Sequence, residues 1–274
     1  MKVTIVTPVF NGMPWLPDAV NSVADQRRDV DLEHLVYDGG STDGSVEWLR
    51  EHTSLGYEAI FGPDEGQSDA LAKGFDRAKG DLLGWINADD LLEPGALRRV
   101  VEVFASDPEL AIVTGACLRI DSNGAIISAT PVPPEPTREG LLDLPDVLAQ
   151  PATFFSAAAY RRTEGLDRRY DLAMDLDLWY KLARVGAIKP LPDEILARFR
   201  VHPMAKSTAR AAATARQDLR IRRRHGVPLR SRSVITMFNI GYVRPVVRRC
   251  TSPFRWVARR LLLSGRTRDK SARS

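Results

Sequence analysis

Hydrophobic and polar positions follow two alternating periods through the N-terminal part of the chain. Short apolar runs rich in β-branched residues predict buried strands, at 2–8, 32–38, 56–62 and 81–87. Between and after them, apolar residues recur every three to four positions and predict helices, at 16–26, 45–51, 68–79 and 94–106. This alternation predicts an α/β fold with a mostly parallel sheet covered by helices on both faces.

Beyond residue 107 the pattern changes to longer strands and fewer helices. Two apolar stretches flanking the turn "DSNG" predict an antiparallel hairpin, because Asn123 and Gly124 suit the positive φ angles of a tight turn. A helix follows in "MDLDLWYKLARVG", and a further strand is predicted at 195–203. We therefore expect one domain made of two halves, 1–106 and 107–205, followed by a C-terminal extension, 206–274.

The charge is distributed unevenly along the 274 residues, although the net charge is only +4. From Arg198 onward there are 21 basic residues against two acidic ones, which leaves 18 basic and 33 acidic residues in 1–197. The body is therefore acidic and the C-terminal extension strongly basic. Such opposed halves predict a compact body and an extension attracted to anionic surfaces.

Other compositional signals narrow the class of protein. Hydrophobic residues make up 44% of the chain, which is ordinary for a soluble globular protein. No stretch reaches the roughly 20 apolar residues that a membrane span requires, and the N-terminal run is too interrupted for a signal peptide. Cys117 and Cys250 are far apart and suggest neither a disulfide framework nor a zinc site. We expect a cytoplasmic protein.

The predicted strands end in residues that can bind ligands. Pro8, Asp38 and the segment 87–90 follow the first, second and fourth strands. In parallel sheets, ligands bind beyond the carboxyl ends of the strands. These three strand ends should therefore meet at one edge of the sheet.

Asp89 and Asp90 stand side by side in "NADD" at that edge. Two carboxylates there can hold Mg²⁺ or Mn²⁺, which usually also contacts substrate phosphates. The alternative is a helix-capping aspartate beside a solvated one. The position next to Asp38 favours a metal or nucleotide site.

Asp38 opens the turn "DGGSTDGS". A carboxylate there can accept hydrogen bonds from a nucleobase N–H or a ribose hydroxyl, although a plain tight turn would have the same sequence. Neither a GxGxxG fingerprint nor a Walker sequence is present, so dinucleotide and P-loop sites have no support.

Two further places carry candidate chemistry. In "MDLDLW", Asp175 and Asp177 lie at a predicted helix start, where one can cap the helix and the other act as a general base. An aspartate with an ordinary pKa of about 3.9 is ionised at neutral pH, as such a base must be. His202 closes the body beside basic residues, where phosphate contacts would be useful.

Taken in order, four segments resemble the signatures of family 2 glycosyltransferases with the GT-A fold. They are "VTIVTPVFNGMPWLPDAVNSVADQ", "HLVYDGGSTDGS", "GPDEGQSDALAKGFDRAKGDLLGWINADDLLEPGAL" and "MDLDLW". The resemblance covers about residues 2–205. It implies an inverting transfer from a nucleotide-diphospho-sugar to an acceptor hydroxyl, assisted by Mg²⁺ or Mn²⁺.

The resemblance also implies roles for individual residues. Pro8 and Asp38 would line the base pocket, and Asn11, Gln67 and Asp69 would complete the nucleotide-sugar site. Asp89 would lie near the ribose and the cation. Asp90 would be the direct ligand of the cation, and His202 would contact the cation or the diphosphate. Asp175 would be the catalytic base.

Three residues depart from the family pattern. Asn87 stands where many members have an aspartate, which leaves the metal to Asp89 and Asp90. Glu65 stands where an arginine is common and Ala72 where an asparagine is common, so the donor sugar and its base stay open. Two alternative functions also stay open, a nucleotidyltransferase and a sugar-nucleotide-binding protein without catalytic activity.

In the C-terminal extension, arginines alternate with Val, Phe, Trp and Leu at roughly helical spacing. A basic amphipathic segment of this kind can lie on the inner face of the cell membrane, which would suit a lipid-linked glycan or glycolipid acceptor. The other interpretations are a protein-docking helix, a solvated tail and a nucleic-acid-binding arm. No nucleic-acid-binding motif supports the last of these, so we expect no nucleic-acid partner.

Overall fold

The computed structural model describes residues 1–132, 148–205, 210–228, 230–238 and 240. Its strands form one sheet of nine: β1 Lys2–Val9, β2 Asp31–Asp38, β3 Glu58–Phe61, β4 Leu82–Trp85, β5 Leu91–Leu92, β6 Leu110–Ile120, β7 Ile126–Thr130, β8 Thr153–Ser156 and β9 Ala187–Arg200. The α-helices are α1 Leu16–Ala24, α2 Ser45–Glu51, α3 Gln67–Arg77, α4 Ala96–Ser106, α6 Ala157–Arg161, α7 Met174–Leu182, α9 Ala211–Arg224 and α10 Arg232–Phe238. Three 3₁₀ turns are Asp25–Arg28, Thr53–Leu55 and Gln150–Ala152.

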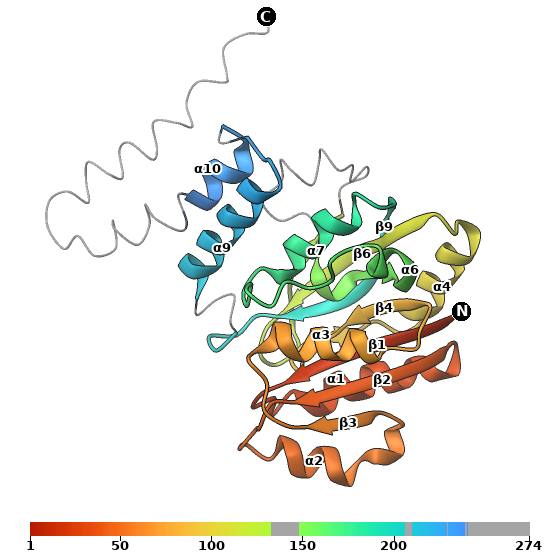
Figure 1. Ribbon diagram of the computed structural model, residues 1–274. Coiled ribbons are helices and arrows are strands. Elements are labelled where there is room, and N and C mark those ends of the chain that lie inside the picture. The colour runs from red at the N-terminus through yellow and green to blue at the C-terminus, as the bar shows by residue number, and fades with distance from the viewer. Residues whose placement is uncertain (133–147, 206–209, 229, 239, 241–274) are drawn as a thin grey trace, which may run out of the picture.

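The strand order is β3-β2-β1-β4-β8-β6-β9-β5, with β7 paired to β6. The first four strands in this order are parallel to one another, as the N-terminal pattern predicted. β8 is antiparallel to both β4 and β6, whereas β9 is parallel to β6. The predicted α/β fold with flanking helices is confirmed, and the sheet becomes mixed in its second half (Figure 1).

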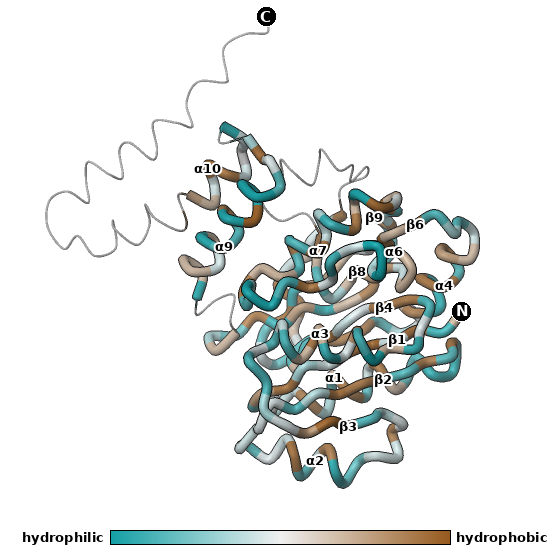
Figure 2. The backbone as a smooth tube through the Cα atoms, in the orientation of Figure 1, coloured by the Kyte–Doolittle hydropathy of each residue, from teal (hydrophilic) through white to brown (hydrophobic). Residues whose placement is uncertain are grey.

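Alternation along the strands gives the sheet two buried faces. Val6 joins a core with α3, α6 and α7, whereas its neighbour Ile5 joins a core with α1 and α4. Successive side chains of a strand point to opposite faces, so a run of apolar residues is needed where both faces are covered. Figure 2 shows the hydrophobic residues concentrated along the strands and the hydrophilic ones along the loops.

The predicted hairpin after residue 107 is confirmed as β6 and β7. The strand predicted at 195–203 begins earlier, at Ala187, and ends at Arg200. Its first half contains Pro190 and Pro192, which have no N–H to donate, and the β6–β9 register is irregular around Gly115. Because proline is uncommon inside a strand, the sequence pattern did not predict this half of β9.

The described part of the basic extension packs against the body. α9 and α10 contribute apolar side chains to the same core cluster as α7, including Ala215, Leu219 and Met237. In Figure 1 they lie beside α7 at the end of the sheet away from α2. No helix in the described ranges combines the length and the apolar character needed to span a lipid bilayer. The proposed division at residues 106 and 205 remains a prediction, and the apolar-arginine segment at 255–263 lies outside the described residues.

Candidate active site

Three strand ends meet at one edge of the sheet. β1 lies between β2 and β4 and is parallel to both, so their carboxyl ends point the same way. Pro8 is half-buried near the end of β1, and Asp38 is the last residue of β2, opposite Val9. The segment 87–90 follows β4 directly. The predicted common edge is therefore confirmed.

Asp38 is buried, with only 2% of its surface exposed. Its Oδ1 accepts hydrogen bonds from the backbone N–H groups of Gly40 and Ser41, both at 2.9 Å. Its Oδ2 is buried and has no partner among the described residues. A buried polar atom without a partner is costly, and at this edge a donor group of a ligand would satisfy it.

Asn11 connects the loops that follow β1 and β2. Its Oδ1 accepts a hydrogen bond from Thr42 N–H at 2.9 Å, and its own N–H donates to Ser41 Oγ at 2.8 Å. Asn11 has a φ of 53°, in the left-handed region that asparagine tolerates better than most residues. These contacts hold the turn that carries Asp38.

The two adjacent aspartates have different environments. Asp90 is 0% exposed, and its oxygens accept hydrogen bonds from Arg200 N–H at 3.0 Å and from Asn87 Nδ2 at 2.9 Å. Burial, and then the negative charge of Asp89, raises the pKa of Asp90 well above its usual range. The Asp89 side chain is 28% exposed, and its Oδ2 lies 2.9 Å from His202 Nε2. Of the two carboxylates, only that of Asp89 is accessible to a ligand.

His202 and Asp89 are held in place by Trp15 and Arg200. The Trp15 ring lies 4.2 Å from that of His202, and its Nε1–H donates to Ser122 O at 3.1 Å. Arg200 Nε donates to Asp89 O at 3.0 Å, and its guanidinium also reaches the carbonyls of Asp121 and Ser122. Arg200 is only 3% exposed, so its charge is used within the protein and is not available for phosphate, contrary to what its position beside His202 suggested.

Asn87 is the centre of an amide network. Its Oδ1 accepts from Gln67 Nε2 at 2.7 Å, while its Nδ2 donates to Asp90 and to Gln150 Oε1 at 3.0 Å. Gln150 in turn donates to Trp85 O at 2.7 Å. An ionised aspartate at position 87 could not make these donations. The departure at Asn87 is therefore explained by the buried carboxylate that it neighbours.

Asp69 has both carboxylate oxygens engaged within the protein. Lys73 Nζ lies 2.7 Å from Oδ2 and Arg168 Nη1 lies 3.1 Å from Oδ1. The hydrogen bond from Lys73 is the main cause that lowers the pKa of Asp69. These contacts give Asp69 a structural role at the start of α3, and its contact with the donor remains a prediction. Of the other departures, Ala72 is buried in the core and Glu65 is exposed.

Asp175 and Asp177 lie in the first turn of α7 but in different surroundings. Asp175 is half-buried and accepts a hydrogen bond from Leu176 N–H at 2.8 Å. Asp177 is 0% exposed, lying 2.8 Å from His225 Nε2 and 2.7 Å from Lys181 Nζ. Burial alone would raise the pKa of Asp177, but the hydrogen bond from His225 and the positive charge of Lys181 lower it. Asp177 therefore anchors α9 to α7, which leaves Asp175 as the candidate base.

The segment before α7 contacts the start of α3, next to Gln67. Ser68 Oγ donates a hydrogen bond to Tyr170 O. Gly66 has a φ of +116°, and a Cβ there would lie 2.9 Å from Asp171 Oδ1. These contacts bring the start of α7, with Asp175, toward the edge of the sheet that carries Asn87.

Among the described residues, no group of three or more His, Cys, Asp or Glu side chains is arranged to hold a metal ion. Mg²⁺ and Mn²⁺ are commonly held by one or two carboxylates together with substrate phosphates. The accessible carboxylate of Asp89 fits that donor set. His202 adds an imidazole whose Nδ1 is buried without a partner among the described residues.

Sequence reasoning missed Trp15 and Gln150. Gln150 is 63 positions from Asn87, which donates a hydrogen bond to it, and Trp15 is 107 positions from Ser122. Trp15 lies inside the first segment that resembles the family, but no local pattern could have joined either residue to its distant partner.

Comparison with known proteins identifies the class. The model of glycosyl transferase family 2 matches residues 4–163, more than half of the chain. An uncharacterized glycosyltransferase of Nostoc sp. (strain PCC 7120 / SAG 25.82 / UTEX 2576) is 30% identical over 233 residues, which cover 80% of this chain and 70% of the relative. The protein therefore belongs to glycosyltransferase family 2, whose members transfer a sugar from a nucleotide sugar, and this decides against the nucleotidyltransferase alternative.

A second relative is longer than this chain. The chondroitin synthase of Escherichia coli is 30% identical over 189 residues, which cover 68% of this chain. The matched part spans only 27% of that synthase. The similarity therefore concerns one part of the synthase.

Solved structures confirm the GT-A type of fold. Residues 1–349 of TarS from S. aureus, in complex with UDP-GlcNAc, match with a TM-score of 0.69 over 94% of this chain and 78% of that chain, at 13% identity. The mannosyltransferase PcManGT from Pyrobaculum calidifontis, in complex with GDP-Man and Mn²⁺, matches with a TM-score of 0.64 over 96% and 79%, at 20% identity.

Proposed function

We propose that this glycosyltransferase transfers a hexosyl group from a nucleoside-diphospho-sugar to an acceptor hydroxyl with inversion at the anomeric carbon. The observation that carries the proposal is the arrangement at the sheet edge. There the accessible carboxylate of Asp89 lies beside His202, and the buried Oδ2 of Asp38 lacks a partner among the described residues. The nucleotide sugars in the complexes of TarS and PcManGT support a donor of this class.

In this proposal the nucleoside occupies the ends of β1 and β2. Asp38 Oδ2 accepts a hydrogen bond from a base N–H or a ribose hydroxyl, and Pro8 lines the same place. Asn11 fixes the loop around it. Gln67 donates a hydrogen bond to Asn87 at the end of β4, where it is also placed to contact the donor.

We assign the cation contact to Asp89, because Asp90 is buried and both its oxygens already accept hydrogen bonds. His202 is also buried and its Nε2 lies 2.9 Å from Asp89, so in this proposal it serves the cation by positioning that carboxylate. Asp90 instead fixes the loop that presents Asp89. Bound there, Mg²⁺ or Mn²⁺ would supply Lewis-acid stabilisation of the negative charge on the diphosphate. The Mn²⁺ in the PcManGT complex supports this assignment.

Asp175 is the proposed base. Its carboxylate takes the proton of the acceptor hydroxyl as that oxygen forms a bond to the anomeric carbon. On the opposite face, the bond from the anomeric carbon to the diphosphate oxygen breaks, and the nucleoside diphosphate leaves. A single displacement of this kind inverts the anomeric centre.

For the acceptor, we propose a lipid-linked glycan or glycolipid, reached by peripheral binding to the inner face of the cell membrane. Support comes from the basic extension, where α9 presents the exposed arginines Arg220 and Arg223. On α10, Ile235 and Phe238 are 51% and 52% exposed. Basic residues beside exposed apolar ones suit an anionic membrane surface. Cosedimentation with vesicles should increase with their anionic lipid content, and binding independent of that content would contradict the proposal.

A thermal-shift screen of nucleoside-diphospho-sugars, with and without Mn²⁺, tests the donor assignment. A ligand that binds only the folded state raises the melting temperature by mass action. We expect one donor to stabilise the protein more strongly with Mn²⁺ than without it. Incubation of that donor with acceptors should release a nucleoside diphosphate, whereas binding without any release would indicate a non-catalytic protein.

A further inference from the structure

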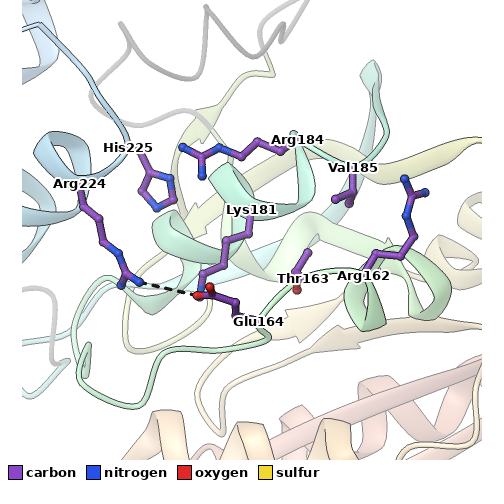
Figure 3. Close-up of a pocket in the computed structure, with 8 residues that line it drawn as sticks. All are labelled: Arg162, Thr163, Glu164, Lys181, Arg184, Val185, Arg224 and His225. Atoms are coloured by element: carbon purple, nitrogen blue, oxygen red, sulfur yellow. Dashed lines mark ion pairs between the residues drawn. The ribbon is translucent and has the colours of Figure 1, made fainter.

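A hollow lies where the C-terminal ends of α6, α7 and α9 converge. It has a volume of about 370 Å³, and its lining residues are Arg162, Thr163, Glu164, Lys181, Arg184, Val185, Arg224 and His225 (Figure 3). Asp175 and Lys181 are about 9 Å apart along the axis of α7, at 1.5 Å per residue. The hollow is therefore at the far end of the helix that begins with the proposed base.

The lining of this helix-end pocket is predominantly basic. Four of its eight residues carry a permanent positive charge, and one, Glu164, carries a negative charge. Lys181 is balanced by Asp177 at 2.7 Å, and Arg224 by Asp167 at 2.7 Å. Glu164 makes only a longer ion pair with Arg224, at 3.7 Å.

Arg162 and Arg184 are not balanced in this way. Both side chains are exposed, and neither has an ion pair or a side-chain hydrogen bond to any residue that the structure describes. A cation near one helix C-terminus is common, since it offsets the helix dipole. Three such ends account for several cations around one hollow, but they leave the exposed guanidinium groups of Arg162 and Arg184 without a carboxylate partner among the described residues.

His225 lines one side of the pocket. Its side chain is 4% exposed, and its Nε2 is bound to Asp177 Oδ1 at 2.8 Å. The ring stacks on Tyr180 with centroids 4.8 Å apart. Its Nδ1 is buried without a partner in the described part of the chain. Because Nε2–H donates to the Asp177 carboxylate, Nδ1 of the neutral ring is an acceptor, so His225 contributes a wall of the hollow and no hydrogen bond to an anion.

We propose that the helix-end pocket binds an anion that carries a phosphate or diphosphate group. Guanidinium groups match phosphate oxygens with two parallel N–H donors, so Arg162 and Arg184 are the primary contacts. Lys181 and His225, fixed by Asp177, line the hollow beneath them. The site is separate from the donor site, and the ligand can be a free anion or a phosphate headgroup on a lipid.

Calorimetric titration of the full chain with pyrophosphate in EDTA tests this site without a cation at the donor edge. The variant R162Q/R184Q should bind at least about tenfold more weakly than the wild type, since each charge-assisted hydrogen bond contributes substantially. The matched control R28Q/R98Q removes two exposed arginines on the α1 and α4 side and should bind like the wild type. D89N should also bind like the wild type, because it alters only the donor edge.

A second arm uses phosphatidylcholine vesicles with and without phosphatidic acid. If the wild-type protein binds only the vesicles that contain phosphatidic acid, and R162Q/R184Q does not bind them, the ligand is a lipid headgroup. Binding of pyrophosphate that R162Q/R184Q loses, without such an effect on vesicles, identifies a free anion. Equal behaviour of R162Q/R184Q and the wild type in both arms, or loss of pyrophosphate binding in D89N alone, would overturn the proposal.

Discussion

Two buried aspartates show how differently the sheet edge and the α7–α9 junction treat a negative charge. Asp90 and Asp177 are both 0% exposed. Burial and the neighbouring Asp89 raise the pKa of Asp90, which has an amide and a backbone N–H as its hydrogen-bond donors. The pKa of Asp177 is lowered despite burial, because His225 donates a hydrogen bond to it and Lys181 places a positive charge beside it. Burial alone thus does not set the pKa, and the charge of the partners decides its direction.

The difference separates a site that can accept a cation from one that is already satisfied. At the sheet edge the carboxyl groups of Asp89 and Asp90 are adjacent, and no lysine or arginine forms an ion pair with either of them among the described residues. At the junction the carboxylate of Asp177 is matched by Lys181 and His225, and this contact joins the extension to α7. The comparison predicts that substitutions at the edge affect binding and turnover, whereas substitutions at the junction affect stability.

Asp175→Asn should have the largest effect on turnover. Removal of a general base typically lowers the rate by about 10²- to 10⁴-fold, and here the amide leaves donor binding intact. Steady-state kinetics and donor titration measure the two effects separately. Undiminished turnover would remove Asp175 as the base.

Asp177→Asn should unfold the junction without abolishing donor binding. Breaking a buried ion pair by removing one partner costs about 3–5 kcal/mol, because Lys181 then loses its counter-charge. Urea denaturation measures this loss, and Asp193→Asn, which removes an exposed carboxylate from β9, should change the stability little.

The stability of the wild type and of Asp177→Asn can also be compared as a function of pH. A lowered pKa means that the unfolded state binds the proton more tightly, so the stability from Asp177 is present above the unfolded value of about 3.9. It is lost as the pH falls through the lower pKa of the folded state. The stability difference between the wild type and Asp177→Asn should therefore narrow below about pH 4. A difference that widens there would contradict the lowered pKa.

Asp89→Asn should weaken Mn²⁺ binding in the presence of a nucleoside diphosphate by at least about tenfold, since even residues around a metal's ligands commonly have effects of this size. Calorimetry measures the affinity directly. Asp18→Asn is the control, because Asp18 is 66% exposed and lies 3.8 Å from Arg200 without reaching the proposed cation site. Equal losses in both variants would indicate a general effect of charge in place of direct contact.

Asn87→Asp should have the smallest effect, a loss of about 1 kcal/mol of stability, because Asp90 and Gln150 lose a hydrogen-bond donor. Thermal denaturation without metal measures it, with the turn variant Asn123→Asp as control. An increase in stability would show that the amide network around Asn87 is not needed.

Much of the fold and part of the site could be predicted from the chain itself. Strand and helix periods, and the polar residues after each strand, reflect local geometry that neighbouring residues impose. They placed Pro8, Asp38 and Asp89 at one edge because parallel strands have their carboxyl ends on the same side. The family signatures indicated the class of reaction because each of them is a continuous segment of the chain and can be recognised without the fold.

What only the tertiary structure decided is which of these residues remain accessible. Asp89 and Asp90 are equivalent in the sequence, but Arg200, 110 positions later, occupies one of them with its backbone N–H. Asp177 becomes structural because His225, 48 positions away, reaches it. Burial and hydrogen bonding depend on groups brought together by folding, and no local period in the sequence records them. The sequence therefore determined where the carboxylates gather, and the packing determined which of them can still bind a ligand.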